Sequence, residues 1–106
     1  MSDETVDWLV QEVNDLLDVS SVGLYEFIEL LADSGLPAEE RRHIAQGALD
    51  RLVAAGGVGL YEMRWPESEH VRPTAAVIWR RPDRDDATYV ALDRESGAPA
   101  NGDAAS

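Results

Sequence analysis

The residues best suited to acid–base or metal chemistry are the two histidines, His43 and His70. His70 follows Glu67 and Glu69, so these three side chains could form a loose group of metal ligands. Zinc sites in proteins usually have ligands at fixed helical or loop spacings, and neither histidine belongs to such a spacing. The chain of 106 residues contains no cysteine, which excludes disulfides and thiolate metal sites. We therefore expect no bound metal and no cofactor.

The serines and glycines do not form a catalytic or phosphate-binding motif. None of the serines lies in a Gly-x-Ser-x-Gly turn, which presents the nucleophile in many hydrolases. The sequence Gly56-Gly57-Val58-Gly59 follows a predicted helix and enters a predicted strand, whereas a phosphate loop precedes its helix. These glycines are typical of a helix end. The sequence therefore predicts a protein without enzymatic activity.

One serine has a partial counterpart in a known family. Asp33-Ser34-Gly35-Leu36 follows an acidic helical segment and resembles the attachment serine of acyl carrier proteins, which are also small and acidic. In carrier proteins Asp-Ser-Leu stands at the start of a helix, whereas Gly35 and Pro37 follow the serine here. A β-rich second half with three tryptophans also differs from a four-helix carrier. A carrier function is therefore a minor alternative.

Apolar residues at helical spacing predict three helices in the first half of the chain. They cover residues 5–18, 24–33 and 37–55, and residues 19–22 could add a brief strand. On the third helix the buried side is expected to hold Ile44, Ala45, Ala48, Leu49 and Leu52, and the opposite side Glu39, His43, Gln46, Gly47 and Asp50.

The second half of the chain has the alternating pattern of strands. A strand is predicted over residues 58–65, with Val58 and Leu60 on one face and Tyr61, Met63 and Trp65 on the other. Residues 66–73 and 82–87 are expected to be loops. A second strand is predicted over residues 74–80, where a short helix is the alternative, and a third over 88–92. We expect Trp65 and Trp79 to occupy alternating strand positions and to pack in the core or against the wing.

These elements predict a single domain over residues 1–94, followed by a disordered tail over residues 95–106, which is rich in Gly, Ala, Pro, Asn and Asp. The fold class is α+β, with three helices followed by a β-hairpin or a small antiparallel sheet. The stretch from Val22 to Trp65, and above all the helix end and strand in residues 51–61, resembles winged helix-turn-helix domains. In that family the third helix enters the major groove of DNA and the wing contacts phosphates.

The charge is strongly acidic and unevenly distributed. Nine basic and 21 acidic residues give a net charge of -12. Residues 1–40 contain eleven carboxylates and no lysine or arginine, whereas the remainder is nearly neutral. Helices that carry only negative charge lack the pairs of opposite charge that usually stabilise helices. We therefore expect these carboxylates to converge on one exposed face that binds a basic partner.

Trp8 lies outside the apolar stripe of the first helix, so it is either the anchor of that face or covered by the hairpin or the tail. An aromatic residue surrounded by charge is typical of a protein-binding hot spot. The predicted partner-binding residues are Trp8, Glu12, Asp15, Glu26, Glu29 and Asp33. Proteins that bind a basic partner in this way include immunity proteins, antitoxins and DNA mimics, and we expect one of these functions.

DNA binding is the alternative function. It would use the third helix and the wing, with Arg42, His43, Gln46, Arg51, Arg64 and Arg72 as contacts. The net charge opposes it, since the carboxylates would repel a polyanion. The absence of an apolar run of about 20 residues and the acidic amino terminus predict a cytoplasmic protein that does not enter the membrane.

Overall fold

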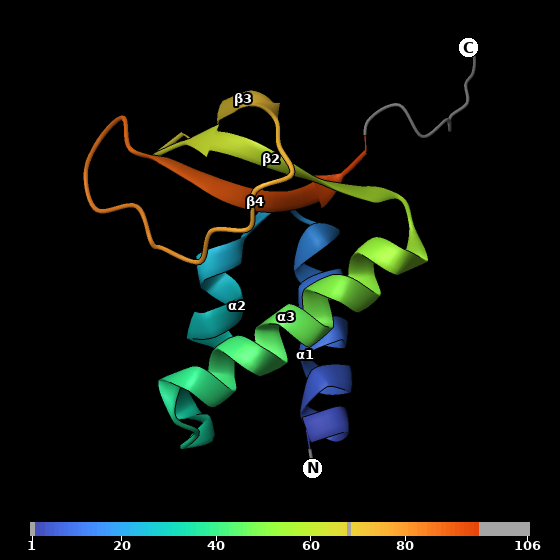
Figure 1. Cartoon of the computed structure of the whole chain (residues 1–106). Helices are drawn as coiled ribbons and strands as arrows, with labels where there is room; N and C mark the ends of the chain where they lie inside the picture. Colours follow the sequence, from blue (N-terminus) through green and yellow to red (C-terminus); the bar gives the residue numbers. More distant parts are fainter. Residues whose placement is uncertain (1, 68, 96–106) are drawn as a thin grey trace.

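The computed structural model describes residues 2–67 and 69–95, which form a helical layer beneath a β-sheet (Figure 1). In chain order the elements are α1 (Ser2–Leu17), β1 (Val22–Gly23), α2 (Leu24–Leu30), the 3₁₀ helix η1 (Ala32–Ser34), α3 (Ala38–Ala55), β2 (Val58–Arg64), β3 (Glu69–Pro73) and β4 (Thr88–Arg94). The predicted α+β fold class is confirmed.

The three helices bury their apolar sides against one another and against one face of the sheet. Leu9 and Val13 of α1, Phe27 of α2 and Ile44 of α3 are completely or almost completely buried in one cluster. The predicted buried side of α3 is confirmed at all five positions. Burial of these side chains provides the main driving force for assembling the helical layer.

One residue on the predicted outer side of α3 was wrongly placed. Gly47 is half-buried, and a Cβ atom built on it would lie 3.5 Å from Cγ2 of Val6. Helix α3 packs against α1 along this side. The contact surface of α3 is therefore wider than a single apolar stripe, because Val6 of α1 lies beside Gly47.

The sheet has four antiparallel strands in the order β1-β4-β2-β3. Strand β4 is central, and its side chains alternate between the two faces. Val90 and Leu92 join the helical core, while Tyr89 and Ala91 belong to a second cluster with Met63. The alternation predicted for β2 is confirmed, because Val58 and Leu60 join the first cluster and Tyr61, Met63 and Trp65 the second.

The prediction for residues 66–80 was wrong in two places. Residues 69–73, expected to be loop, form the edge strand β3, with Glu62 opposite Arg72 and Arg64 opposite Glu69. Residues 74–80 form neither strand nor helix. An edge strand is paired on one side only and needs no apolar pattern, so its charged sequence gave no signal.

Trp79 of the segment 74–87, which we call the long loop, packs on the core instead of lying in a strand. The ring of Trp79 packs edge-on against Phe27, with 6.1 Å between ring centroids. Figure 1 shows the long loop (orange) descending from the sheet to α2. Trp79 thus packs on the core as predicted but does not lie on a strand, and Trp65 packs against Tyr89.

The ends of the predicted elements also differ in detail. The second helix ends at Leu30 and is followed by η1, and Gly35 then adopts a left-handed conformation with φ 77°. Glu95, which we assigned to the tail, donates its backbone N–H to the carbonyl of Gly57 at 3.0 Å. The rest of the predicted tail, residues 96–106, lies outside the described residues. Among the described residues, no helix has the length and apolarity needed to cross a membrane.

Candidate functional site

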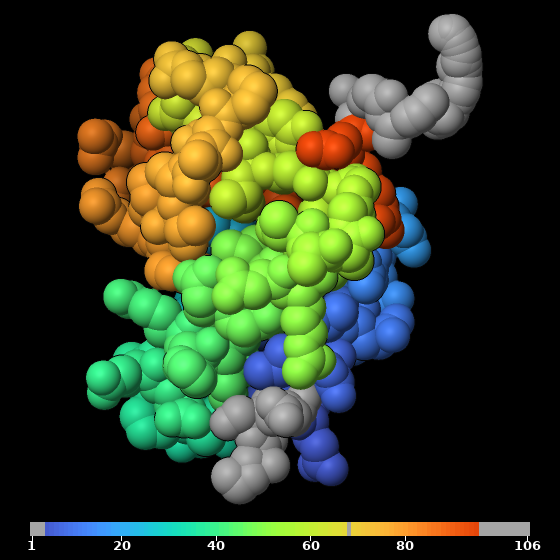
Figure 2. All heavy atoms as spheres, turned by 45° about the vertical axis from the view of Figure 1, so that its right-hand side comes forward, coloured from blue at the N-terminus to red at the C-terminus, as the bar shows by residue number. Residues whose placement is uncertain are grey.

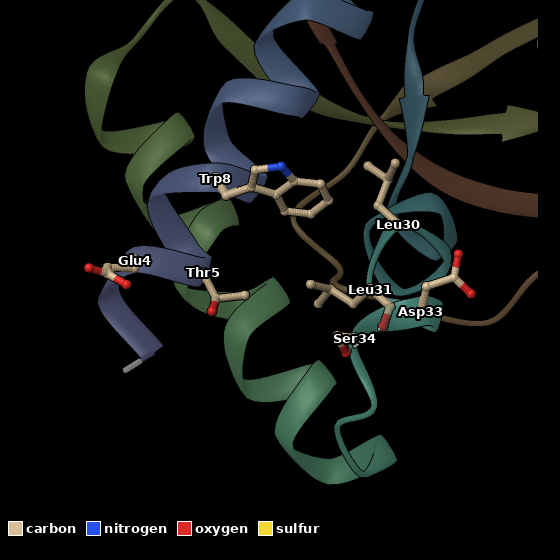
Figure 3. A pocket seen from close by; sticks show the side chains of 7 residues that line it. All are labelled: Glu4, Thr5, Trp8, Leu30, Leu31, Asp33 and Ser34. Atoms are coloured by element: carbon tan, nitrogen blue, oxygen red, sulfur yellow. Dashed lines mark hydrogen bonds between the residues drawn. The ribbon is translucent and has the colours of Figure 1, made fainter.

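A groove of about 470 Å³ separates α1 from the end of α2, and we call it the Trp8 groove (Figure 3). Helix α1 contributes one wall, and the other wall comes from the last turn of α2 and from η1. The lining residues are Glu4, Thr5, Trp8, Leu30, Leu31, Asp33 and Ser34. The groove therefore joins residues that lie more than twenty positions apart in the sequence.

Trp8 provides the apolar surface of the groove. Its side chain is 45% exposed, which confirms that it lies outside the buried stripe of α1. Figure 3 shows the indole leaning from α1 across the groove toward Leu30 and Leu31. A half-exposed indole offers a large contact area at low entropic cost, which is the usual property of a binding anchor.

Two carboxylates stand at the rims of the groove. Glu4 comes from the α1 wall and Asp33 from the η1 wall, and both are exposed. Within the described residues neither makes an ion pair, and no arginine or histidine lines the groove. The hydroxyl of Ser34 donates to the carbonyl oxygen of Leu31 at 2.6 Å, so its proton is already engaged. The site is apolar in the middle and negative at its edges.

Of the six predicted partner-binding residues, only Trp8 and Asp33 line this groove. Glu12 and Asp15 lie farther along α1, one and two turns beyond Trp8. Asp15 accepts a hydrogen bond from Gln11 at 3.1 Å. Glu26 has a local structural role, because its Oε2 accepts the backbone N–H of Gly23 at 2.8 Å and caps α2. The six residues thus do not form one site.

The expectation of one unbroken acidic face was wrong. Arginines from the second half of the chain fold over three of the first-half carboxylates. The pairs are Arg51 with Asp7, Arg81 with Glu29 and Arg94 with Asp18. The sequence could not show this, because tertiary folding brings Arg51 and Arg94 to α1 and Arg81 of the long loop to α2. The unpaired negative charge is consequently more local than the sequence indicates.

Tyr25, at the start of α2, has a perturbed titration. Burial, with a smaller contribution from the neighbouring Glu26 carboxylate, raises the pKa of Tyr25 to about 12. Arg81 acts in the opposite direction, and its guanidinium carbon lies 5.8 Å from the centre of the Tyr25 ring. The phenol therefore stays protonated at neutral pH and serves packing rather than acid–base chemistry.

The residues of the DNA-binding alternative do not form a free basic surface. Gln46 donates to Asp50 at 3.0 Å, Arg51 is paired with Asp7, and Arg72 donates to Glu62 at 2.5 Å. His43 lines a shallow pocket together with Glu39 and Glu40. Within the described chain, Arg42 and Arg64 make no ion pair.

His70 lies on β3 and interacts with one residue of β2 and one residue of β4. Its Nε2 is 2.9 Å from Oδ2 of Asp93, and its ring stacks on Tyr61 with 4.8 Å between centroids. In the part of the chain that the structure describes, no three His, Asp or Glu side chains converge as metal ligands. The interactions of His70 connect β3, β2 and β4.

Sequence reasoning missed Glu4 and the α2 wall of the groove. Glu4 lies one turn before Trp8, and that spacing alone could have placed both side chains on one side of the helix. No comparable signal predicts Leu30, Leu31 or Ser34, because their proximity to α1 depends on tertiary packing. Comparison with protein-family models, curated proteins and solved structures found no match to this chain.

Proposed function

We propose that this domain is a non-enzymatic protein-binding module that holds a basic protein segment in the Trp8 groove. The observation that carries the proposal is the pairing of a half-exposed indole with two unpaired carboxylates, Glu4 and Asp33, at opposite rims. A cationic side chain fits this arrangement, since its aliphatic part can cover Trp8 while its head group reaches a carboxylate.

The surrounding charge supports the same partner. With a net charge of -12, the whole molecule attracts cationic surfaces and repels nucleic acid at long range. Electrostatic attraction of this kind mainly accelerates association, whereas a buried aromatic contact slows dissociation. The acidic first half would steer the partner, and the Trp8 groove would hold it.

An immunity protein or antitoxin that covers a cationic site is the role that fits this groove best. A DNA mimic would need an extended array of free carboxylates. Asp7, Asp18 and Glu29 are instead paired with arginines of the same chain, which leaves a local binding site rather than a phosphate-like array. We accordingly favour recognition of one protein segment over DNA mimicry.

We further propose that the scaffold is of the winged-helix type. The order α1, β1, α2, α3, β2, β4, with β1 and β2 both paired to β4, supports this assignment. Strand β3 then becomes an additional edge strand within the wing. The side of α3 that would read DNA carries Glu39 and Asp50, so the scaffold serves a different partner here.

The proposal is tested with a fluorescently labelled amphipathic peptide that carries arginines and leucines at helical spacing. Its binding to the full chain is followed by fluorescence anisotropy, with a glutamate-containing counterpart as the negative probe. We expect Trp8→Ala and the double variant Glu4→Lys/Asp33→Lys each to weaken binding at least about tenfold, the loss of one aromatic or charged contact.

The matched control is Glu39→Lys/Asp50→Lys, which changes the net charge equally but alters α3 instead of the groove. Its binding should fall only to the extent that long-range attraction is reduced. Equal losses in the two double variants, together with unchanged binding by Trp8→Ala, would show that the peptide is held by nonspecific charge and would refute the proposal.

A further inference from the structure

A second pocket lies on the other side of α2, between that helix, the start of α3 and the long loop. Its volume is about 490 Å³, and its lining residues are Ile28, Ala38, Arg42, Ile78, Trp79 and Arg80. Figure 2 shows the long loop (orange) lying directly above the first half of α3 (green). This pocket shares no residue with the Trp8 groove.

The charge in this pocket is opposite to that of the molecule as a whole. Among the residues that the structure describes, Arg42 and Arg80 line it, and no carboxylate does. Within the described residues neither arginine makes an ion pair, although Arg51, Arg72, Arg81, Arg84 and Arg94 all do. In a chain with more than twice as many acids as bases, two unpaired guanidinium groups on one pocket are an unusual arrangement.

The rest of the pocket is apolar and aromatic. Ile28 comes from α2 and Ile78 from the long loop, and Trp79 is half-buried, with its ring packed on Phe27. A fixed indole beside aliphatic side chains is suited to contact with a flat ring. Planar guanidinium groups are suited to the oxygen atoms of a phosphate group, which they can bind through paired hydrogen bonds.

We propose that this pocket binds a small organic phosphate in which a phosphoryl group is attached to an aromatic ring. Arg42 and Arg80 bind the phosphoryl oxygens, and the ring lies against Trp79. The pocket volume is within the range of small-molecule sites, about 300–1,000 Å³. The proposal does not depend on the function assigned to the Trp8 groove.

The test is a two-dimensional NMR titration of the full chain with phenyl phosphate, observed at the indole N–H groups of Trp8, Trp65 and Trp79. We expect a saturable shift of the Trp79 signal, with little change at Trp65. Inorganic phosphate lacks the aromatic ring, and benzyl alcohol lacks the phosphoryl group. Both should therefore bind at least about tenfold more weakly than phenyl phosphate.

The decisive variant is Arg42→Gln/Arg80→Gln, which should weaken phenyl phosphate binding at least about tenfold. Arg64→Gln/Arg84→Gln changes the net charge equally and should leave the affinity unchanged. Both arginines of the pocket are exposed, so the variants should keep the circular dichroism spectrum of the wild type. If the double variant unfolds, phenyl phosphate binding is compared instead in the single variants Arg42→Gln and Arg80→Gln.

Three results would overturn the proposal. The first is the absence of a saturable shift at Trp79, and the second is an equal loss of binding in both double variants. The third is equal affinity for phenyl phosphate and inorganic phosphate, since the ring would then contribute nothing.

Discussion

Arg81 of the long loop donates a hydrogen bond to the carboxylate of Glu29 on α2 and lies over the ring of Tyr25. The interaction connects residues 52 positions apart. It places a positive charge beside α2, whose own charged side chains, Glu26 and Glu29, are both negative. The first-half carboxylates are thus partly neutralised by the fold, and Tyr25 reports on that local charge.

Tyr25 should titrate abnormally and make stability depend on pH. The pKa of Tyr25 is about 12 in the folded protein, against 10.0 for an unperturbed tyrosine. Below pH 10 both states are protonated, and the contribution to stability is fully present. As the pH rises from 10 toward 12, the unfolded chain loses its proton first, so the free energy of unfolding should fall.

An ultraviolet titration of tyrosinate formation checks this, with urea unfolding at several pH values. Tyr25→Phe should remove the late titration step and reduce the loss of stability at high pH. Arg81→Gln should move the late step to still higher pH, because Arg81 lowers the pKa of Tyr25. A wild-type titration with all tyrosines near pH 10 would contradict this.

Trp79 should hold the long loop on the core. Removing its ring in Trp79→Ala deletes the contact with Phe27, and we expect the free energy of unfolding to fall by about 2–3 kcal/mol. Trypsin should also cleave faster after Arg80 and Arg84. Val77→Ala is the matched control, because Val77 is an exposed residue of the same loop and should change neither measurement. Equal cleavage rates for wild type and Trp79→Ala would contradict the packing role.

Gly47→Ala should stabilise the protein. The added Cβ would lie 3.5 Å from Val6, which is an ordinary contact distance, so α1 need not move. Replacing glycine by alanine inside a helix is then favourable by about 0.5–1 kcal/mol. Urea unfolding should show this gain, and a loss of stability would mean that α1 and α3 pack more tightly than the structure indicates.

Gly23→Ala should have the opposite effect. A Cβ atom at Gly23 would approach Cε1 of Tyr25 to 2.4 Å and Cε2 of Tyr89 to 3.3 Å. The Tyr25 ring would have to leave its edge-on contact with Tyr89, which we expect to cost about 1–3 kcal/mol of unfolding free energy. Unchanged stability in the same urea experiment would show that this ring moves freely.

The helices could be predicted because one face of each is apolar at a regular period, and strands β2 and β4 because of their apolar residues, which β4 buries on both faces. The buried residues of α3 and the alternation of β2 follow directly from that pattern. Strand β3 could not be predicted, since its charged residues 69–73 are ordered by pairing with β2 alone. The β-branched residues before Trp79 were misleading, because they accompany a loop that packs on the core instead of joining the sheet.

The candidate site was predictable only in part, for a related reason. The exposure of Trp8 follows from its position on α1, but the groove exists because Leu30, Leu31 and Asp33 are folded beside it. The ion pairs between the arginines and the first-half carboxylates could not be predicted from the sequence either. The partner of Glu29 lies in the long loop, and no local pattern connects the two residues.

The most direct test of the central proposal follows the three tryptophan indole N–H signals while the arginine- and leucine-containing peptide is added to the full chain. Trp8 lies in the proposed groove, whereas Trp65 lies in the cluster on the far face of the sheet and serves as an internal control. We predict a saturable shift of the Trp8 signal that is lost in Glu4→Lys/Asp33→Lys, while Trp65 stays unchanged. A Trp8 signal that stays constant while the peptide binds, or while Trp65 or Trp79 shifts instead, would contradict the account.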